Sequence, residues 1–202
     1  MPDRTQLDSD VRPVDSIALT YGPVKTEPGV LVHSRRSREA GAETWLILAA
    51  PDTTEARREW AEYGVALLRC DLTFTAVRIP ADIFLAAAGT TNRDEVADYL
   101  SDALDGGPCF FDGNSRSFYV LTPLSTGRWW DVPDTELLSG GGRFLGVPAT
   151  TITEPDPRCA AYWVVPMGGP AALCDPGILR WLVQRSRIRL SEAARLEAGE
   201  DA

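Results

Sequence analysis

The sequence contains few of the residues and motifs that point directly to catalysis. It has one histidine, His33, and four scattered cysteines, none of which forms a C-x-x-C pair. A zinc site would need closer spacing and more histidines, so the cysteines are expected to be buried free thiols. The sequence has no phosphate-binding glycine loop and no G-x-S-x-G nucleophile motif, and Ser-His-Asp catalysis would depend on His33 alone. These absences argue against most common enzyme classes.

The sequence also lacks long apolar segments and an excess of positive charge. No apolar run approaches the roughly 18–20 residues of a membrane helix, and the first ten residues contain no apolar segment typical of a secretory signal. We therefore expect no membrane partner and a cytoplasmic location. The net charge of −9 argues against non-specific binding to nucleic acid, which requires positive charge facing the phosphates. A local basic patch is still compatible with this charge.

Composition divides the chain into three parts. Residues 1–43 are rich in Asp, Pro, Ser and Arg and are expected to form a flexible extension, in which 29–32 is either an edge strand or unpacked. The arginine-rich stretch 34–38 is expected to be a solvated linker, with contact to phosphate or to an acidic partner as the alternative. Residues 44–184 carry the regular apolar pattern of a folded domain. Residues 185–202 form a C-terminal tail that is first basic and then acidic.

The apolar pattern of residues 44–184 predicts a mixture of strands and helices. Asp52 and Asn92 are predicted helix N-caps, because a glutamate follows each of them three residues later and completes a capping box. Asp175 is expected to cap a third helix, whose first position is proline. Strands are expected over residues 45–49, 65–68, 74–79, 109–111, 117–122, 144–147 and 162–165. This mixture, with a hairpin between helices, favours an α+β fold (a mixed α/β two-layer domain).

Three segments in this order resemble the primase-polymerase (prim-pol) domain, the family of bifunctional DNA primase/polymerase N-terminal domains. FTAVRIPADIFLAAA at 74–88 resembles the family's catalytic strand and the helix after it. GGPCFFDGNSRSFYVLTP at 106–123 resembles its Gly-Pro strand, turn and aromatic return strand. GGGRFLGVPAT at 140–150 and AYWVVP at 161–166 resemble its Gly-rich turn and a strand that ends in proline. The resemblance covers about two-thirds of the chain and is to a short, stand-alone version.

Composition adds a hint about the source. All basic residues except Lys25 are arginine, and alanine, glycine and proline are abundant. This bias is typical of a GC-rich genome, such as an actinobacterial one, and is explained by the base composition of the genome before any function is invoked.

The resemblance implies chemistry for which the residues are missing here. Prim-pol domains hold two divalent metals with carboxylates on the catalytic strand, and the corresponding positions are Arg78 and Pro80. Arginine repels Mg²⁺ and proline offers no ligand side chain. The region of the family's phosphate-binding histidine is occupied by Arg116 and Ser117. We therefore expect primase or polymerase activity to be lost and no cofactor to be bound, with Mg²⁺ or Mn²⁺ required only for a residual activity.

These observations predict a catalytically degenerate prim-pol-like domain, which acts as a nucleotide- or nucleic-acid-binding or regulatory accessory module. One alternative is a protein-interaction subunit without a nucleic-acid role, whose partners dock on the tails or on exposed aromatic residues. A second alternative is a residual metal-dependent nucleotidyltransferase that uses Asp71, Asp82 and Glu136. Trp129 is either a stacking platform for a base or a packing residue. The candidate contacts to a nucleotide or a single strand are Arg78, Arg116, Arg128, Trp129 and Arg143.

Overall fold

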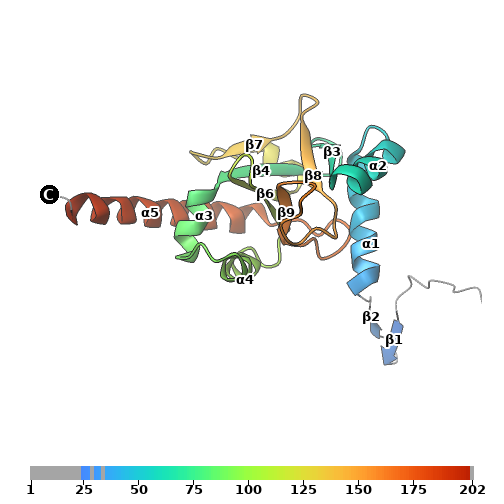
Figure 1. The fold of residues 1–202 in the computed structure, drawn as a ribbon, viewed down its shortest axis with the longest axis horizontal. Helices are drawn as coiled ribbons and strands as arrows, with labels where there is room; N and C mark the ends of the chain where they lie inside the picture. Colours follow the sequence, from blue (N-terminus) through green and yellow to red (C-terminus); the bar gives the residue numbers. More distant parts are fainter. Residues whose placement is uncertain (1–23, 28–29, 33–34, 201–202) are drawn as a thin grey trace, which may run out of the picture.

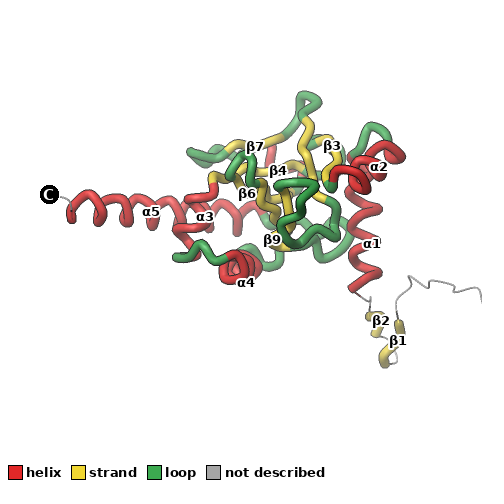
Figure 2. Tube along the Cα trace, viewed as in Figure 1, coloured by secondary structure: helices red, strands yellow, loops and turns green. Residues whose placement is uncertain are grey.

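The computed structural model describes residues 24–27, 30–32 and 35–200, and its centre is a five-stranded antiparallel sheet (Figures 1 and 2). The strand order is β7-β4-β6-β5-β9, so the long strand β6 lies in the middle. The bounds are β4 Thr75–Pro80, β5 Cys109–Asp112, β6 Ser117–Thr122, β7 Glu136–Leu138 and β9 Ala161–Val165.

Two smaller antiparallel pairs accompany this sheet. β3 (Val65–Arg69) pairs with β8 (Phe144–Pro148), and β1 (Val24–Glu27) pairs with β2 (Val30–Val32). In the second pair positions 30–32 form a strand, whereas positions 29 and 33–34 lie outside the described residues.

Two groups of helices cover the two faces of the sheet. The first group, α3, α4 and α5, packs on what we call the helical face, and the second group, α1, η1 and α2, packs with β3 and β8 on the opposite face. No helix among the described residues is long and apolar enough to cross a membrane. The helix bounds are α1 Arg35–Leu46, η1 Ile47–Ala49, α2 Thr53–Tyr63, α3 Ala81–Ala88, α4 Arg93–Ala103, η2 Leu124–Arg128 and α5 Pro176–Glu200.

The alternation of side chains along β4 assigns residues to the two faces. Val77 and Ile79 are fully buried on the helical face, where they pack with α3, α4 and α5. Ala76 is buried on the opposite face, against the core that α1 and α2 complete. Because successive side chains of a strand point to opposite faces, Arg78 and Pro80 follow Ala76 onto that face. The chain is thus one α+β domain with a core on each side of its sheet, which confirms the predicted fold class.

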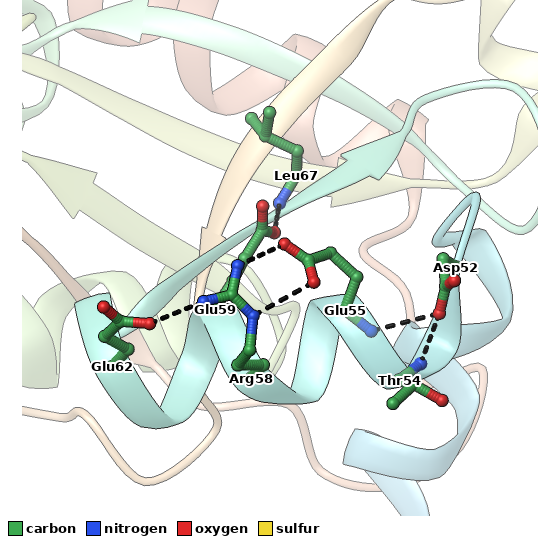
Figure 3. A network of polar contacts seen from close by, with 7 residues as sticks. All are labelled: Asp52, Thr54, Glu55, Arg58, Glu59, Glu62 and Leu67. Atoms are coloured by element: carbon green, nitrogen blue, oxygen red, sulfur yellow. Dashed lines mark hydrogen bonds and ion pairs between the residues drawn. The ribbon is translucent and has the colours of Figure 1, made fainter.

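Local capping explains where α2 begins and how it is attached. Asp52 accepts hydrogen bonds from the backbone amides of Thr54 and Glu55 at 2.8 and 3.0 Å, as the capping box predicts. Figure 3 shows this cap and, further along the helix, Glu59, whose carboxylate accepts the Leu67 amide of β3 at 3.1 Å. The contact ties α2 to β3, and β3 in turn holds β8 in place beside the main sheet.

The prediction of a strand at residues 45–49 is wrong. α1 ends at Leu46 and the 3-10 helix η1 follows directly. Ala42, Leu46 and Ala49 are fully buried at helical spacing, while Leu48 points to solvent. A short continuous apolar run fits a buried helix as well as a buried strand, and here the helical spacing that begins at Ala42 decides between them.

Other element boundaries differ from the sequence-based expectation. α1 begins at Arg35 and α5 continues to Glu200, so both helices cross the predicted domain boundaries at 43–44 and 184–185. The three-residue strand β7 was not predicted, because so short a strand carries no readable alternation. Tyr63, which follows the buried Ala56 and Trp60 at helical spacing, is half exposed at the last position of α2.

Candidate functional site

The opposite face of the sheet changes from apolar to polar along β4. Ala76 lies between Leu121 of β6 and Leu138 of β7, and all three belong to the core on this face. Two residues further along β4, Arg78 lies between Tyr119 of β6 and Glu136 of β7. The next row on this face pairs Pro80 with Ser117. Along β4 this face therefore changes from the buried Ala76 to the half-exposed Arg78, while Tyr119 and Ser117 of β6 stay buried.

Four polar residues meet on this surface, and we call them the arginine cluster: Arg78, Ser117, Glu136 and Arg143. Arg78 donates from Nε to Ser117 Oγ at 3.1 Å and from Nη1 to Glu136 Oε2 at 3.5 Å. Arg143 donates to the other oxygen, Glu136 Oε1, at 3.0 Å. One carboxylate thus bridges two guanidinium groups, and the cluster carries a net positive charge.

The arginine cluster is held by backbone as well as by side chains. Arg78 and Glu136 are cross-strand partners, and Ser117 Oγ donates to the carbonyl of Ser115 at 3.0 Å. The two arginines remain half exposed, with side-chain accessibilities of 40% for Arg78 and 51% for Arg143. Their positions are therefore restrained, while about half of each side chain is accessible to solvent.

A cavity of about 380 Å³ lies next to the cluster, between β5, β6, β8 and residues 158–161. Tyr119, the cross-strand neighbour of Arg78, lines it together with Phe110. The two rings are stacked, with centroids 5.0 Å apart and planes 11° from parallel. Asp112 and Asn114 add polar groups from the hairpin turn. The cavity thus has an aromatic wall and a polar rim, and Tyr119 links it to the strand position of Arg78.

The arginine that lines the cavity is neutralised by its own partner. Arg158 donates from Nε and Nη2 to the two oxygens of Asp156, both at 2.9 Å. This hydrogen-bonded guanidinium lowers the pKa of Asp156 to about 2. The pair contributes no net charge to the cavity, whereas the arginine cluster carries one net positive charge.

The structure brings two of the five predicted contact residues together. Arg78 and Arg143 are both in the arginine cluster, and Arg116 precedes Ser117 in the hairpin turn, where its backbone adopts a φ of 47°. Arg128 and Trp129 lie after the far end of β6, which is about 17 Å long. Trp129 faces α5, with the guanidinium carbon of Arg180 5.9 Å from its ring centroid. These two residues belong to a different surface.

The carboxylates considered for a metal site do not gather. Asp71 binds Arg69 through two hydrogen bonds, which lower the pKa of Asp71, and Glu136 is held by two arginines. Asp82 lies in the first turn of α3, in a hollow with Asp134 and Arg187. Within the part of the chain that the structure describes, no three potential ligands come together. The residues present do not fit the two-metal site that the resemblance implies.

Part of this site was not evident in the sequence. The Phe110–Tyr119 stack was missed, because it depends on the register of β5 against β6, and the local Arg158–Asp156 pair, whose members are two residues apart, was missed as well. The alternation of the return strand did carry a signal, since residues 117, 119 and 121 share the parity that the structure assigns to the opposite face.

Comparison of the chain with protein-family models, with curated proteins and with solved structures found no match in any of the three. The resemblance to prim-pol domains therefore stays a prediction from the sequence.

Proposed function

We propose that the protein is a non-catalytic binding module that holds a nucleotide, or one nucleotide of a single strand, on the opposite face of its sheet. The observation that carries this proposal is the convergence of Arg78 and Arg143 beside an open, aromatic-walled cavity. Under the resemblance to prim-pol domains, we propose that this module is a degenerate accessory domain that retains the groove of the family and lacks the metal ligands.

The arginine cluster has hydrogen-bond capacity left for a phosphate. A guanidinium has five N–H donors. Arg78 uses one each on Ser117 and Glu136, and Arg143 uses one on Glu136. The unused donors of two neighbouring guanidinium groups suit a phosphate, which takes several charge-assisted hydrogen bonds at once.

The cavity next to the cluster supplies the second half of the proposed site. Its volume of about 380 Å³ is of the size that small-molecule sites have. The edge of the Tyr119 ring, the amide of Asn114 and the carboxylate of Asp112 offer apolar contact and hydrogen bonds to a base. A phosphate on the arginines and a base in the cavity would bind opposite ends of one nucleotide.

The test is a fluorescence-anisotropy titration with a labelled single-stranded DNA and with a labelled ATP analogue, at low and at moderate salt. We expect saturable binding that weakens with salt. The Arg78→Ala and Arg143→Ala variants should each weaken it about tenfold, because each removes a charge-assisted contact. Arg128→Ala is the matched control, since Arg128 is exposed on a different surface.

The outcomes distinguish a specific site from non-specific electrostatic attraction and from the absence of binding. Equal losses in Arg78→Ala and Arg128→Ala would indicate a diffuse electrostatic attraction instead of a site. A loss in Arg116→Ala would extend the site into the hairpin turn, and unchanged binding would remove Arg116 from it. Failure of the wild-type protein to bind either probe at low salt would refute the proposed function.

A further inference from the structure

α5 carries an exposed stripe that the domain itself does not use. Leu179, Leu182 and Val183 are buried against the helical face, on one side of this helix. Trp181 and Ile188 lie seven residues apart and are 57% and 59% exposed. Residues seven apart on an α-helix share a face. Two of the exposed large apolar side chains therefore lie on one solvent face of α5.

The polar residues on the same stripe have no complementary charge among the described residues. Arg185 lies over the Trp181 ring, with its guanidinium carbon 5.3 Å from the centroid, and makes no ion pair. Glu192 and Arg195 are exposed and also make none. By contrast, Arg187 on the neighbouring side of the helix pairs with Asp134 of the domain. We call Trp181, Arg185, Ile188, Glu192 and Arg195 the α5 stripe.

We propose that the α5 stripe is a dimer interface in which two copies of this chain pair their α5 helices antiparallel, with the two-fold axis at Ile188. In this register Ile188 meets its own copy. Trp181, seven residues before Ile188, lies opposite Arg195 of the other copy, seven residues after it. Arg185 and Glu192 lie three before and four after Ile188 and are neighbours across the interface. The stripe is therefore complementary to itself, as a two-fold interface requires.

Each contact in this register has a physical basis. The Arg195 guanidinium on the Trp181 face is a cation–π contact, and the symmetry forms it twice. The Arg185–Glu192 ion pair also forms twice, and it gives both side chains the opposite charge that they lack within one chain. The Ile188 pair adds apolar burial at the centre.

The position of α5 leaves room for a second copy. Its C-terminal half extends past α3 and away from the sheet (Figure 1). From Trp181 to Arg195 the stripe is about 21 Å long, at 1.5 Å per residue. One helix pair of this length buries less than the roughly 800 Å² per partner of a standard interface, so we expect a dimer that dissociates in the micromolar range.

The test is sedimentation equilibrium of the full chain over about 1 to 200 μM, a range that spans micromolar dissociation. We expect the mass to rise toward twice the 22.0 kDa of one chain. Arg185→Glu and Glu192→Arg should each raise the dissociation constant about tenfold or more, because symmetry places two like-charge contacts in each dimer. Arg57→Glu on α2 is the control, since it makes the same charge change on an exposed residue of another surface.

The antiparallel register predicts that dimer formation is restored when the two variants are combined, which a different partner protein on the α5 stripe would not explain. An equimolar mixture of the Arg185→Glu and Glu192→Arg variants restores both ion pairs in the mixed dimer, so the mixture should associate as tightly as the wild type. The double variant in one chain should recover as well. Wild-type protein that stays monomeric over the whole range overturns the proposal, and so does a dimer that both single variants leave unchanged. A dimer that the single variants weaken, but that mixing does not restore, overturns the antiparallel register.

Discussion

Replacing Glu136 by glutamine tests the proposed anion site more sharply than removing an arginine does. The carboxylate occupies one donor of each guanidinium, at 3.5 Å from Arg78 and 3.0 Å from Arg143. It is also a negative charge beside the proposed phosphate position. A glutamine of the same shape can still accept a hydrogen bond but no longer repels an anion. Glu136→Gln should therefore strengthen nucleotide binding, whereas most substitutions in a binding site weaken it.

The size of this gain follows from Coulomb's law. A phosphate on the two arginines would lie about 5 Å from the carboxylate, where two unit charges interact by about 1 kcal/mol in a water-like dielectric. The half-exposed side chains of the cluster favour this solvent-screened limit over a larger value. An energy of about 1 kcal/mol corresponds to about fivefold in the dissociation constant. The gain should shrink as salt is added, because the Debye length falls to about 8 Å at physiological ionic strength.

The same anisotropy titration measures this gain. Glu62→Gln is the matched control, because Glu62 is an exposed glutamate that also pairs with an arginine, on the outer surface of α2. A similar gain in both variants would reflect only the change in net charge. A loss of binding in Glu136→Gln would refute the reasoning, since it would make the carboxylate a ligand contact and not a competitor. A loss that appears only with Mg²⁺ present would favour a metal-dependent site instead.

Three further predictions concern the fold. Asp52→Ala should lower the free energy of unfolding by about 1 kcal/mol in urea titrations, because two backbone amides of α2 lose their cap. Gly107→Ala should lower the free energy of unfolding by about 1–3 kcal/mol, because the added Cβ would lie 2.6 Å from the Cβ and 2.9 Å from the Cα of Cys174. Gly106→Ala should lower it by about 1 kcal/mol, because Gly106 has a φ of 70° although no atom lies within 4 Å of the added Cβ. Burial raises the pKa of Cys70 and of Cys174 from 9.0 to about 12. Below pH 9 these thiols are protonated in both the folded and the unfolded chain. Between pH 9 and 12 they ionise only in the unfolded chain, so the free energy of unfolding should fall as the pH rises. Cys70→Ala should make this fall with pH less steep.

Features that depend on neighbours in sequence could be read before the structure was known. The predicted caps form as expected: Asn92 accepts the amides of Asp94 and Glu95, just as Asp52 does for α2. The hairpin was also predicted with nearly correct bounds, because its turn residues lie between two apolar runs. In each case the interaction spans a few residues, so the local pattern contains all of the information.

The arrangement of the site depends on contacts between distant parts of the chain. Arg78 and Glu136 are 58 residues apart, and they meet only because β7 pairs with the free edge of β4. The sequence named both residues but gave no reason to place them together, since β7 has only three residues. Arg128 and Trp129 show the opposite case. They follow a strand of the site directly, yet the length of β6 carries them to the other end of the sheet.

The charge at one strand position distinguishes the proposed anion site from the metal site that the resemblance implies. With a carboxylate in place of Arg78, its cross-strand neighbour Glu136 would make a pair of like charges, which favours a bound cation or a protonated carboxyl group. With arginine there, the same neighbour becomes a counter-ion, and Arg143 on its other oxygen makes the cluster positive. The resemblance to prim-pol domains implies carboxylates in the rows of Arg78 and Pro80, where this chain carries an arginine and a proline. For this reason the absence of metal ligands on β4 leads to a proposal of anion binding and not simply to the loss of a site.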